Sequence, residues 1–161
     1  MPTLTHLPTQ VLGDIIEIGD KNAGVNQYGW YVDGFNYNIS SESDCVHSGQ
    51  YGLEIKPETV DTRGSFWGIH YSPPLTKIKY INFWVKGKKG GEIVFVWVTT
   101  DYGAESGFYS DKYVEISASE WRFVKITLSN YSEGTFSFFS FILEQGTGTD
   151  SVCIDDVSFT P

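Results

Sequence analysis

Short runs of alternating apolar and polar residues constrain this chain more than any other feature. Residues 79–86 (KYINFWVK) place Ile81, Phe83 and Val85 on one face and polar or amphipathic residues on the other. No segment of ten or more residues has the period of a capped helix. The alternation therefore predicts an all-β domain.

Turn residues separate about ten such runs, roughly every 8–12 residues, as in sandwiches and barrels. A loop rich in Gly, Asn and Asp is expected over residues 20–34, and a turn at 48–52 leads into a strand. The 108–116 run is expected to be one strand with a kink or two short strands. The expected strands cover residues 11–18, 35–39, 53–56, 65–71, 79–86, 92–99, 108–116, 121–128, 136–144 and 152–159.

The size of the chain, 161 residues, suits one domain. We expect a tail or linker over residues 1–10 and a single module over 11–161. The first ten residues lack the basic start and apolar run of a signal peptide, and no stretch is long and apolar enough to span a membrane. We interpret the chain as a module of a larger secreted protein.

The net charge of −9 disfavours binding to nucleic acid or to an anionic membrane. Aromatic residues make up 16% of the chain, more than a core of this size usually holds, so some rings are expected at the surface. Cys45 and Cys153 allow one disulfide that would close a long loop, and two buried free thiols are an equal alternative.

The closing strand contains two adjacent carboxylates, Asp155 and Asp156. A buried carboxylate needs a partner, and calcium bound by oxygen ligands would supply one. An exposed strand edge with solvated acids explains the same residues equally well.

Four segments resemble the β-sandwich (jelly-roll) carbohydrate-binding modules that are appended to polysaccharide-degrading enzymes. They are HSGQYGL at 47–53, YINFWVKG at 80–87, EWRFVKI at 120–126 and IDDV at 154–157, in the order found in that group. The resemblance implies a two-sheet antiparallel β-sandwich. One sheet would hold 53–56, 79–86, 122–128 and 152–159, and the opposite, concave sheet would hold 65–71, 92–99, 108–116 and 136–144.

The resemblance also implies a structural calcium ion. An acid of the first strand and the first acid of the closing motif are typical ligands in these modules, and backbone carbonyls near the Ser-Gly turn complete the shell. The matching positions are Glu17, Asp155 and the carbonyls from His47 to Gly49. At the first of these positions the sequence reads Ile16-Glu17, where these modules usually have Phe-Glu.

A sugar-binding surface needs exposed aromatic rings beside polar side chains. On 92–99, Val94, Val96 and Val98 form one uniform face, so Trp97 is predicted to point outward. Trp67 is a second candidate, although Trp67, Ile69 and Tyr71 could equally be the core set. The remaining candidates are Trp30, Tyr28, Tyr109, Glu144 and Arg63. Trp121 is assigned to packing, and Trp84 is expected to lie under a loop.

Three function classes follow. The favoured one is a non-catalytic, secreted module that binds a β-linked glycan (β-glucan, xylan or mannan) and targets a covalently linked glycoside hydrolase. A catalytic jelly roll is less favoured because no spaced acidic motif and no Ser/His/Asp arrangement is present. A protein-binding or structural sandwich is the third class, since an aromatic patch also serves protein contacts.

Overall fold

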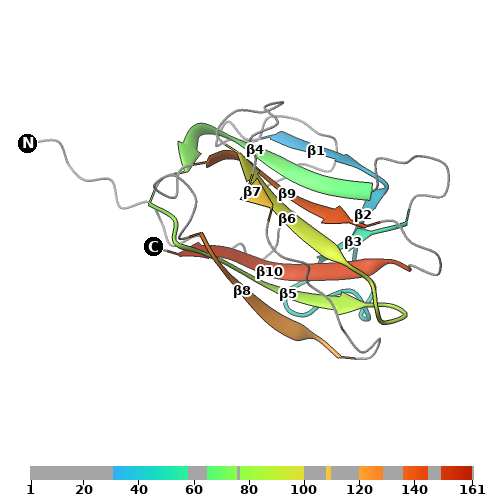
Figure 1. The fold of residues 1–161 in the computed structure, drawn as a ribbon. Helices are drawn as coiled ribbons and strands as arrows, with labels where there is room; N and C mark the ends of the chain where they lie inside the picture. The colour runs from blue at the N-terminus through green and yellow to red at the C-terminus, as the bar shows by residue number, and fades with distance from the viewer. Residues whose placement is uncertain are drawn as a thin grey trace, which may run out of the picture.

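The computed structural model describes residues 31–57, 65–75, 77–99, 108–109, 120–128, 136–144 and 150–160, and these form two five-stranded antiparallel sheets (Figure 1). Sheet A has the order β2-β3-β10-β5-β8, and sheet B has the order β1-β4-β9-β6-β7. The strands are β1 (Tyr31–Phe35), β2 (Tyr37–Ser40), β3 (Gly52–Ile55), β4 (Ser65–Leu75), β5 (Tyr80–Gly87), β6 (Val94–Thr99), β7 (Phe108–Tyr109), β8 (Arg122–Thr127), β9 (Phe136–Leu143) and β10 (Val152–Thr160).

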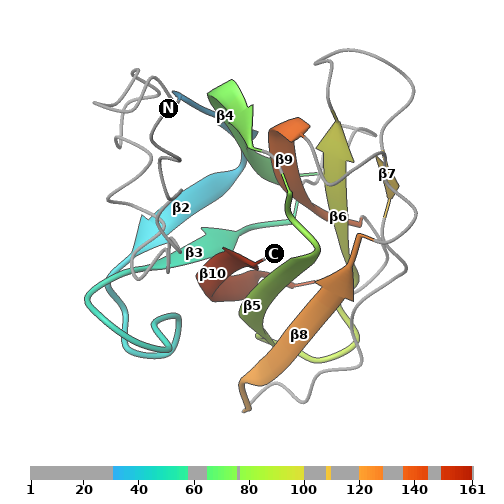
Figure 2. The ribbon, with the colours of Figure 1, turned by 90° about the vertical axis from the view of Figure 1, so that its left-hand side faces the viewer.

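The predicted β-sandwich is confirmed, and so is the division of its strands between the sheets. β3, β5, β8 and β10 share sheet A, while β4, β6, β7 and β9 share sheet B. The two sheets face each other across one interior, as the two views in Figures 1 and 2 show. Within the described ranges, no helix is long and apolar enough to cross a membrane.

The loop predicted over residues 20–34 was wrong at its end, because residues 31–34 belong to β1. Five residue pairs with β4 make this segment a strand at the edge of the described sheet. Its Gly and Asp residues are uncommon in strands, so the sequence alone does not favour this assignment. Asn36 then takes a left-handed backbone conformation (φ 55°), and the chain passes from β1 in sheet B to β2 in sheet A. Asn tolerates that conformation better than most residues do.

The core is built from the inward faces of both sheets. Val94, Val96 and Val98 of β6 are fully buried, and Phe83 of β5 packs edge-to-face on Phe141 of β9 with ring centroids 4.9 Å apart. Each fully buried side chain of this kind stabilises the fold by about 1.5–3 kcal/mol. This packing fixes which residues of each strand remain for the outer faces.

β10 is the central strand of sheet A, paired with β3 on one side and β5 on the other. Its register on β5 shifts between Asp155 and Ser158, and Asp156 has a positive φ of 49°. Such a bulge re-aims side chains at the point where it occurs. The closing IDDV motif therefore forms a local irregularity rather than a plain strand end.

Candidate functional site

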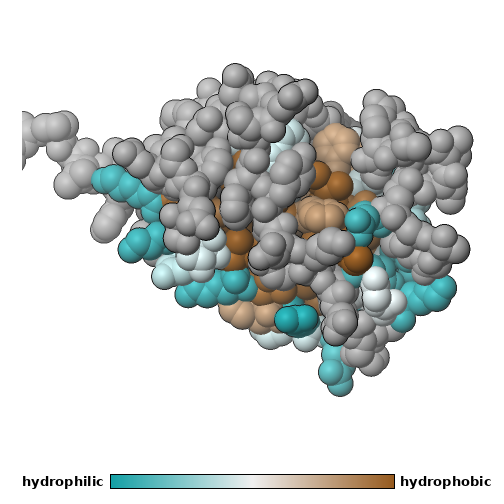
Figure 3. All heavy atoms as spheres, viewed as in Figure 1, coloured by the Kyte–Doolittle hydropathy of each residue, from teal (hydrophilic) through white to brown (hydrophobic). Residues whose placement is uncertain are grey.

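The residues of β6 alternate between the core and the outer face of sheet B. Phe95 and Trp97 lie between the buried valines in sequence and are half-buried, because they point away from the core. The prediction that Trp97 faces outward is confirmed. In the space-filling view, hydrophobic residues (brown) are visible between grey atoms near the middle of the molecule (Figure 3).

Trp67 was a second candidate for this outer face, with a place in the core as the equal alternative, and the structure shows that the core placement is correct. The ring is only 2% exposed and lies in the core, 6.3 Å from the ring of Phe141. Ile69 is also buried, so Trp67 and Ile69 are on the face of β4 that points into the core. Both faces of this strand carry aromatic residues, and the alternation alone therefore did not distinguish inside from outside.

The parity of β4 turns Phe66 outward, into a row that the sequence did not reveal. Phe66 pairs with Phe35 of β1 and with Ile142 of β9, and Ile142 pairs with Phe95 of β6. We call Phe35, Phe66, Ile142 and Phe95 the apolar row. It crosses four strands, a span of roughly 14 Å at the usual strand spacing. Phe35, at its end, is 42% exposed.

Trp97 lies one row further along the sheet. It pairs with Ser140 of β9 on one side and with Tyr109 of β7 on the other, so two predicted site residues occupy neighbouring register positions. The ring of Phe138 meets Trp97 edge-on at 5.6 Å. A Cβ added to Gly68 would lie 2.6 Å from that same ring, so Phe138 covers the glycine.

Glu144 lies at the other end of the outer face. It follows β9, two residues beyond Ile142 of the apolar row and four beyond Ser140, the partner of Trp97. At the rise of an extended strand, four residues separate Glu144 from the Trp97 row by roughly 13 Å. The predictions for Trp30, Tyr28 and Arg63 fall outside the described residues.

The outer face of sheet A is organised by Asp155. Its carboxylate accepts hydrogen bonds from the backbone N–H groups of His47 (2.8 Å), Ser48 (3.1 Å) and Asp156 (2.7 Å). Asp155 is fully buried, and this desolvation raises the pKa of its carboxyl above the usual value, while the backbone N–H donors oppose the shift. Asp155 thus ties the 47–48 turn to the closing strand.

His47 is held between rings and a carboxylate. Its imidazole stacks on Trp84 with centroids 4.1 Å apart and meets Trp121 edge-on at 5.4 Å. Its Nδ1 lies 2.6 Å from Oδ2 of Asp156, and the hydroxyl of Ser48 donates to the other oxygen. The predictions that a loop covers Trp84 and that Trp121 serves packing are confirmed.

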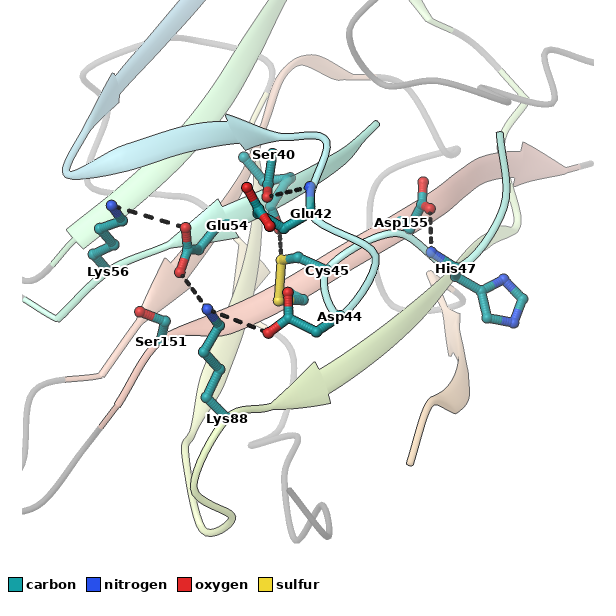
Figure 4. Close-up of a disulfide and its surroundings, with 12 residues drawn as sticks. Ser40, Glu42, Asp44, Cys45, His47, Glu54, Lys56, Lys88, Ser151 and Asp155 are labelled. Carbon is teal, nitrogen blue, oxygen red and sulfur yellow. Dashed lines mark hydrogen bonds and ion pairs between the residues drawn. A yellow bond between two sulfur atoms is a disulfide. The ribbon is translucent and has the colours of Figure 1, made fainter. Parts of the chain in front are cut away.

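A disulfide joins Cys45 to Cys153, which settles a choice that the sequence left open. Figure 4 shows the 41–51 segment lying against β10 at this bond, with the His47 ring pointing away from Asp155. Gly52 permits the close approach, since a Cβ there would lie 1.9 Å from the carbonyl oxygen of Cys45. The ammonium of Lys88 bridges Glu54 (3.1 Å) and Asp44 (3.6 Å) beside the disulfide.

The described residues supply only part of the calcium shell that the resemblance implies. The turn from His47 to Gly49 presents N–H groups to Asp155, and these three bonds use most of the four lone-pair sites of a carboxylate. In the part of the chain that the structure describes, no three acidic, His or Cys side chains gather. Glu17, the other expected ligand, lies outside that part.

No protein-family model matches this sequence, and no curated protein matches it. Solved structures do match its fold. A family 61 carbohydrate-binding module in complex with β-1,4-galactotriose is 19% identical, with a TM-score of 0.54, over 87% of this chain and 95% of that one. A family 29 carbohydrate-binding module is 13% identical, with a TM-score of 0.58, over 85% and 81%.

A third similar structure is the K2 cleaved adhesin domain of Lys-gingipain, which is 12% identical, with a TM-score of 0.62, over 88% of this chain and 96% of that one. All three likenesses cover most of both chains. At these identities they establish the fold. The chain therefore has the β-sandwich fold found in carbohydrate-binding modules.

Proposed function

We propose that this chain is a non-catalytic carbohydrate-binding module whose ligand lies across the outer face of sheet B. The observation that supports this most is the apolar row beside the half-buried Trp97. Sugar rings present flat C–H faces, and a row of rings and one branched apolar side chain across four strands offers a matching surface. The family 61 module of similar fold binds β-1,4-galactotriose, a ligand of the same chemical class.

The positions of the described carboxylates give no support to catalysis. Glu92 is 1% exposed and its two oxygens accept the N–H groups of Lys89 and Gly90, so it serves a turn. Glu144 follows β9 at the end of the outer face. A glycosidase needs a second carboxylate within about 10 Å of the first across the bond that is cleaved.

The proposed ligand, secretion and linked enzyme are those expected of a carbohydrate-binding module. The ligand is a β-linked polysaccharide such as β-glucan, xylan or mannan, and the module is secreted and targets a covalently linked glycoside hydrolase. Single rings contribute little, so an isolated module binds in the micromolar to millimolar range and gains avidity when tethered.

Titration with soluble β-glucan, xylan, mannan and β-1,4-galactan, followed by tryptophan fluorescence, tests the proposal. Binding without product release supports the module, and Trp97→Ala abolishes it. Release of shorter sugars would make the chain an enzyme. Binding to none of the glycans would favour a protein-binding role, in line with the likeness to an adhesin domain.

Calcium is part of the proposal as a structural ion, with Asp155 and Glu17 as carboxylate ligands and His47 and Gly49 contributing carbonyl groups. A bound ion stabilises the folded state in proportion to the logarithm of its concentration. Adding millimolar calcium to protein treated with a chelator therefore raises the melting temperature. An unchanged melting temperature would remove calcium from the account and leave the glycan-binding proposal intact.

A further inference from the structure

The positive charges of the described residues are concentrated on one side of the sandwich. All eight described Lys and Arg residues belong to β5 or β8 or lie within three residues of β3 or β5. They are Lys56, Lys77, Lys79, Lys86, Lys88, Lys89, Arg122 and Lys125. The five strands of sheet B contain none. The chain as a whole has a net charge of −9, yet its described Lys and Arg residues are all near the strands of sheet A.

Aromatic rings continue across the same side of sheet A. Phe123 of β8 is 50% exposed and pairs in register with Trp84 of β5, with ring centroids 5.5 Å apart. Trp84 is stacked on His47, which in turn meets Trp121. Four rings are thus in contact on this side of sheet A: Trp84, Phe123, Trp121 and His47. β8 lies at one edge of the five described strands of sheet A, as Figure 2 shows.

Two lysines of this face lie against rings. The ammonium of Lys86 lies 5.4 Å from the ring centroid of Trp121, and that of Lys125 lies 3.9 Å from the ring centroid of Tyr80. Cation–π contacts of this kind favour positions of each ammonium close to its ring. Phe123 and Lys125 share one face of β8, two residues apart, which is roughly 7 Å.

Acidic side chains do not neutralise these lysines within the described part of the chain. The outward residues of β5 and β8 include no carboxylate, and neither Nζ forms an ion pair with a described acid. Asp156 is already engaged by His47 and Ser48. The row of Lys125 contains no acid, since Lys125 pairs with Asn82 and Asn82 pairs with Ser158. The described acids on this side of the sheet include Asp155, which pairs with Trp84, its neighbour Asp156, and the exposed Glu120 before Trp121.

We propose that the outer face of β5 and β8 is a second binding site, selective for acidic polysaccharides that contain uronic acids. The exposed ring of Phe123 receives the apolar face of a sugar, and Lys86 and Lys125 pair with carboxylates of the chain. An exposed ring with ammonium groups on either side is complementary to a polymer that alternates apolar faces with carboxylates. This site is separate from the outer face of sheet B and does not depend on it.

Oligosaccharides of β-1,4-linked glucuronic acid, compared with cello-oligosaccharides of the same length, test the proposal because they differ only in the group at C6. Amide chemical shifts of the whole chain are followed during titration. We expect the acidic oligosaccharide to perturb β5 and β8, and its affinity to fall at least fivefold between 20 and 200 mM NaCl. The neutral oligosaccharide leaves those strands unperturbed.

Three variants sharpen the result. Phe123→Ala and the double variant Lys86→Gln with Lys125→Gln each weaken binding of the acidic oligosaccharide at least tenfold, while Lys89→Gln, which removes an exposed charge at the β5–β6 turn, changes it less than twofold. Trp97→Ala leaves it unchanged and removes binding of neutral glycans, which separates this site from the proposed function.

Two outcomes would overturn the inference. In one, the acidic oligosaccharide perturbs only sheet B, or perturbs nothing. In the other, polyglutamate of the same length binds as tightly as the uronate and Phe123→Ala has no effect, so that the face attracts acidic chains by charge alone. Since the shifts are first measured on the unaltered protein, a variant that fails to fold leaves the test intact.

Discussion

The outer faces of the two sheets differ in how they are held and in what they present. On sheet A, a disulfide, a buried carboxylate with three amide donors and a stacked His47 tie the 41–51 segment to β10 and β5. On sheet B, the apolar row and Trp97 lie on strands that contain no Lys or Arg. Sheet A therefore carries a segment bonded onto its outer face, whereas sheet B presents a row of apolar side chains beside the half-buried Trp97.

The contrast also shows that residue type alone does not reveal a role. Trp67 and Trp97 lie on strands of the same sheet, yet one is a core residue and the other faces outward. Trp84, which also faces outward, is covered on one side by His47. The predictions below therefore compare residues of similar chemistry in different places.

The largest loss of stability is expected when the disulfide is removed. A bond between residues 108 apart in sequence restricts the unfolded chain strongly, and the chain-entropy relation gives about 4–5 kcal/mol for such a loop. Urea unfolding of the double variant Cys45→Ser, Cys153→Ser measures the free energy of unfolding. A loss below about 1 kcal/mol would mean that other contacts hold the 41–51 segment without the bond.

The two tryptophans of sheet B provide the next comparison. Trp67→Ala removes a fully buried ring and is expected to cost about 3–5 kcal/mol. Trp97→Ala removes a half-buried ring and one edge-to-face pair, at a cost of about 1–2 kcal/mol. Thermal and urea unfolding of both variants measure the difference. Equal losses would place Trp97 in the core and withdraw it from the candidate site.

Asp155 gives a smaller effect on sheet A. Asp155→Asn keeps the shape but turns one acceptor oxygen into a donor that faces backbone N–H groups, at an expected cost of about 1–3 kcal/mol. Glu120→Gln, an exposed acid before β8, serves as the control and changes stability by less than about 0.5 kcal/mol. Equal effects of the two variants would remove Asp155 from its structural role.

The smallest expected effect is a dependence on pH. Burial raises the pKa of Asp155 in the folded protein, so the folded state holds its proton more tightly than the unfolded state does. The resulting stabilisation is fully present below the unfolded pKa and is lost as the pH rises through the folded pKa. The stability difference between the unaltered protein and Asp155→Asn should therefore be larger near pH 3 than near pH 7. The opposite trend would show that the amide donors outweigh burial.

Local alternation was sufficient to predict most of the described strands, β1 being the exception. It also predicted the outward direction of Trp97, because three identical valines mark the inner face of β6. It failed on β4, where Phe66 and Trp67 are both large and aromatic. The apolar row could not be predicted, because it depends on the register of four strands. The stacking of His47 on Trp84 likewise joins segments 37 residues apart in sequence.

The central claim, that neutral β-linked glycans bind on the outer face of sheet B, is tested most directly by mapping amide chemical shifts during titration with the panel of neutral oligosaccharides. The account predicts that at least one of them perturbs β4, β6 and β9 around Phe66, Phe95 and Ile142, and that Trp97→Ala removes the effect. Perturbations confined to sheet A, or none with any oligosaccharide, would contradict it.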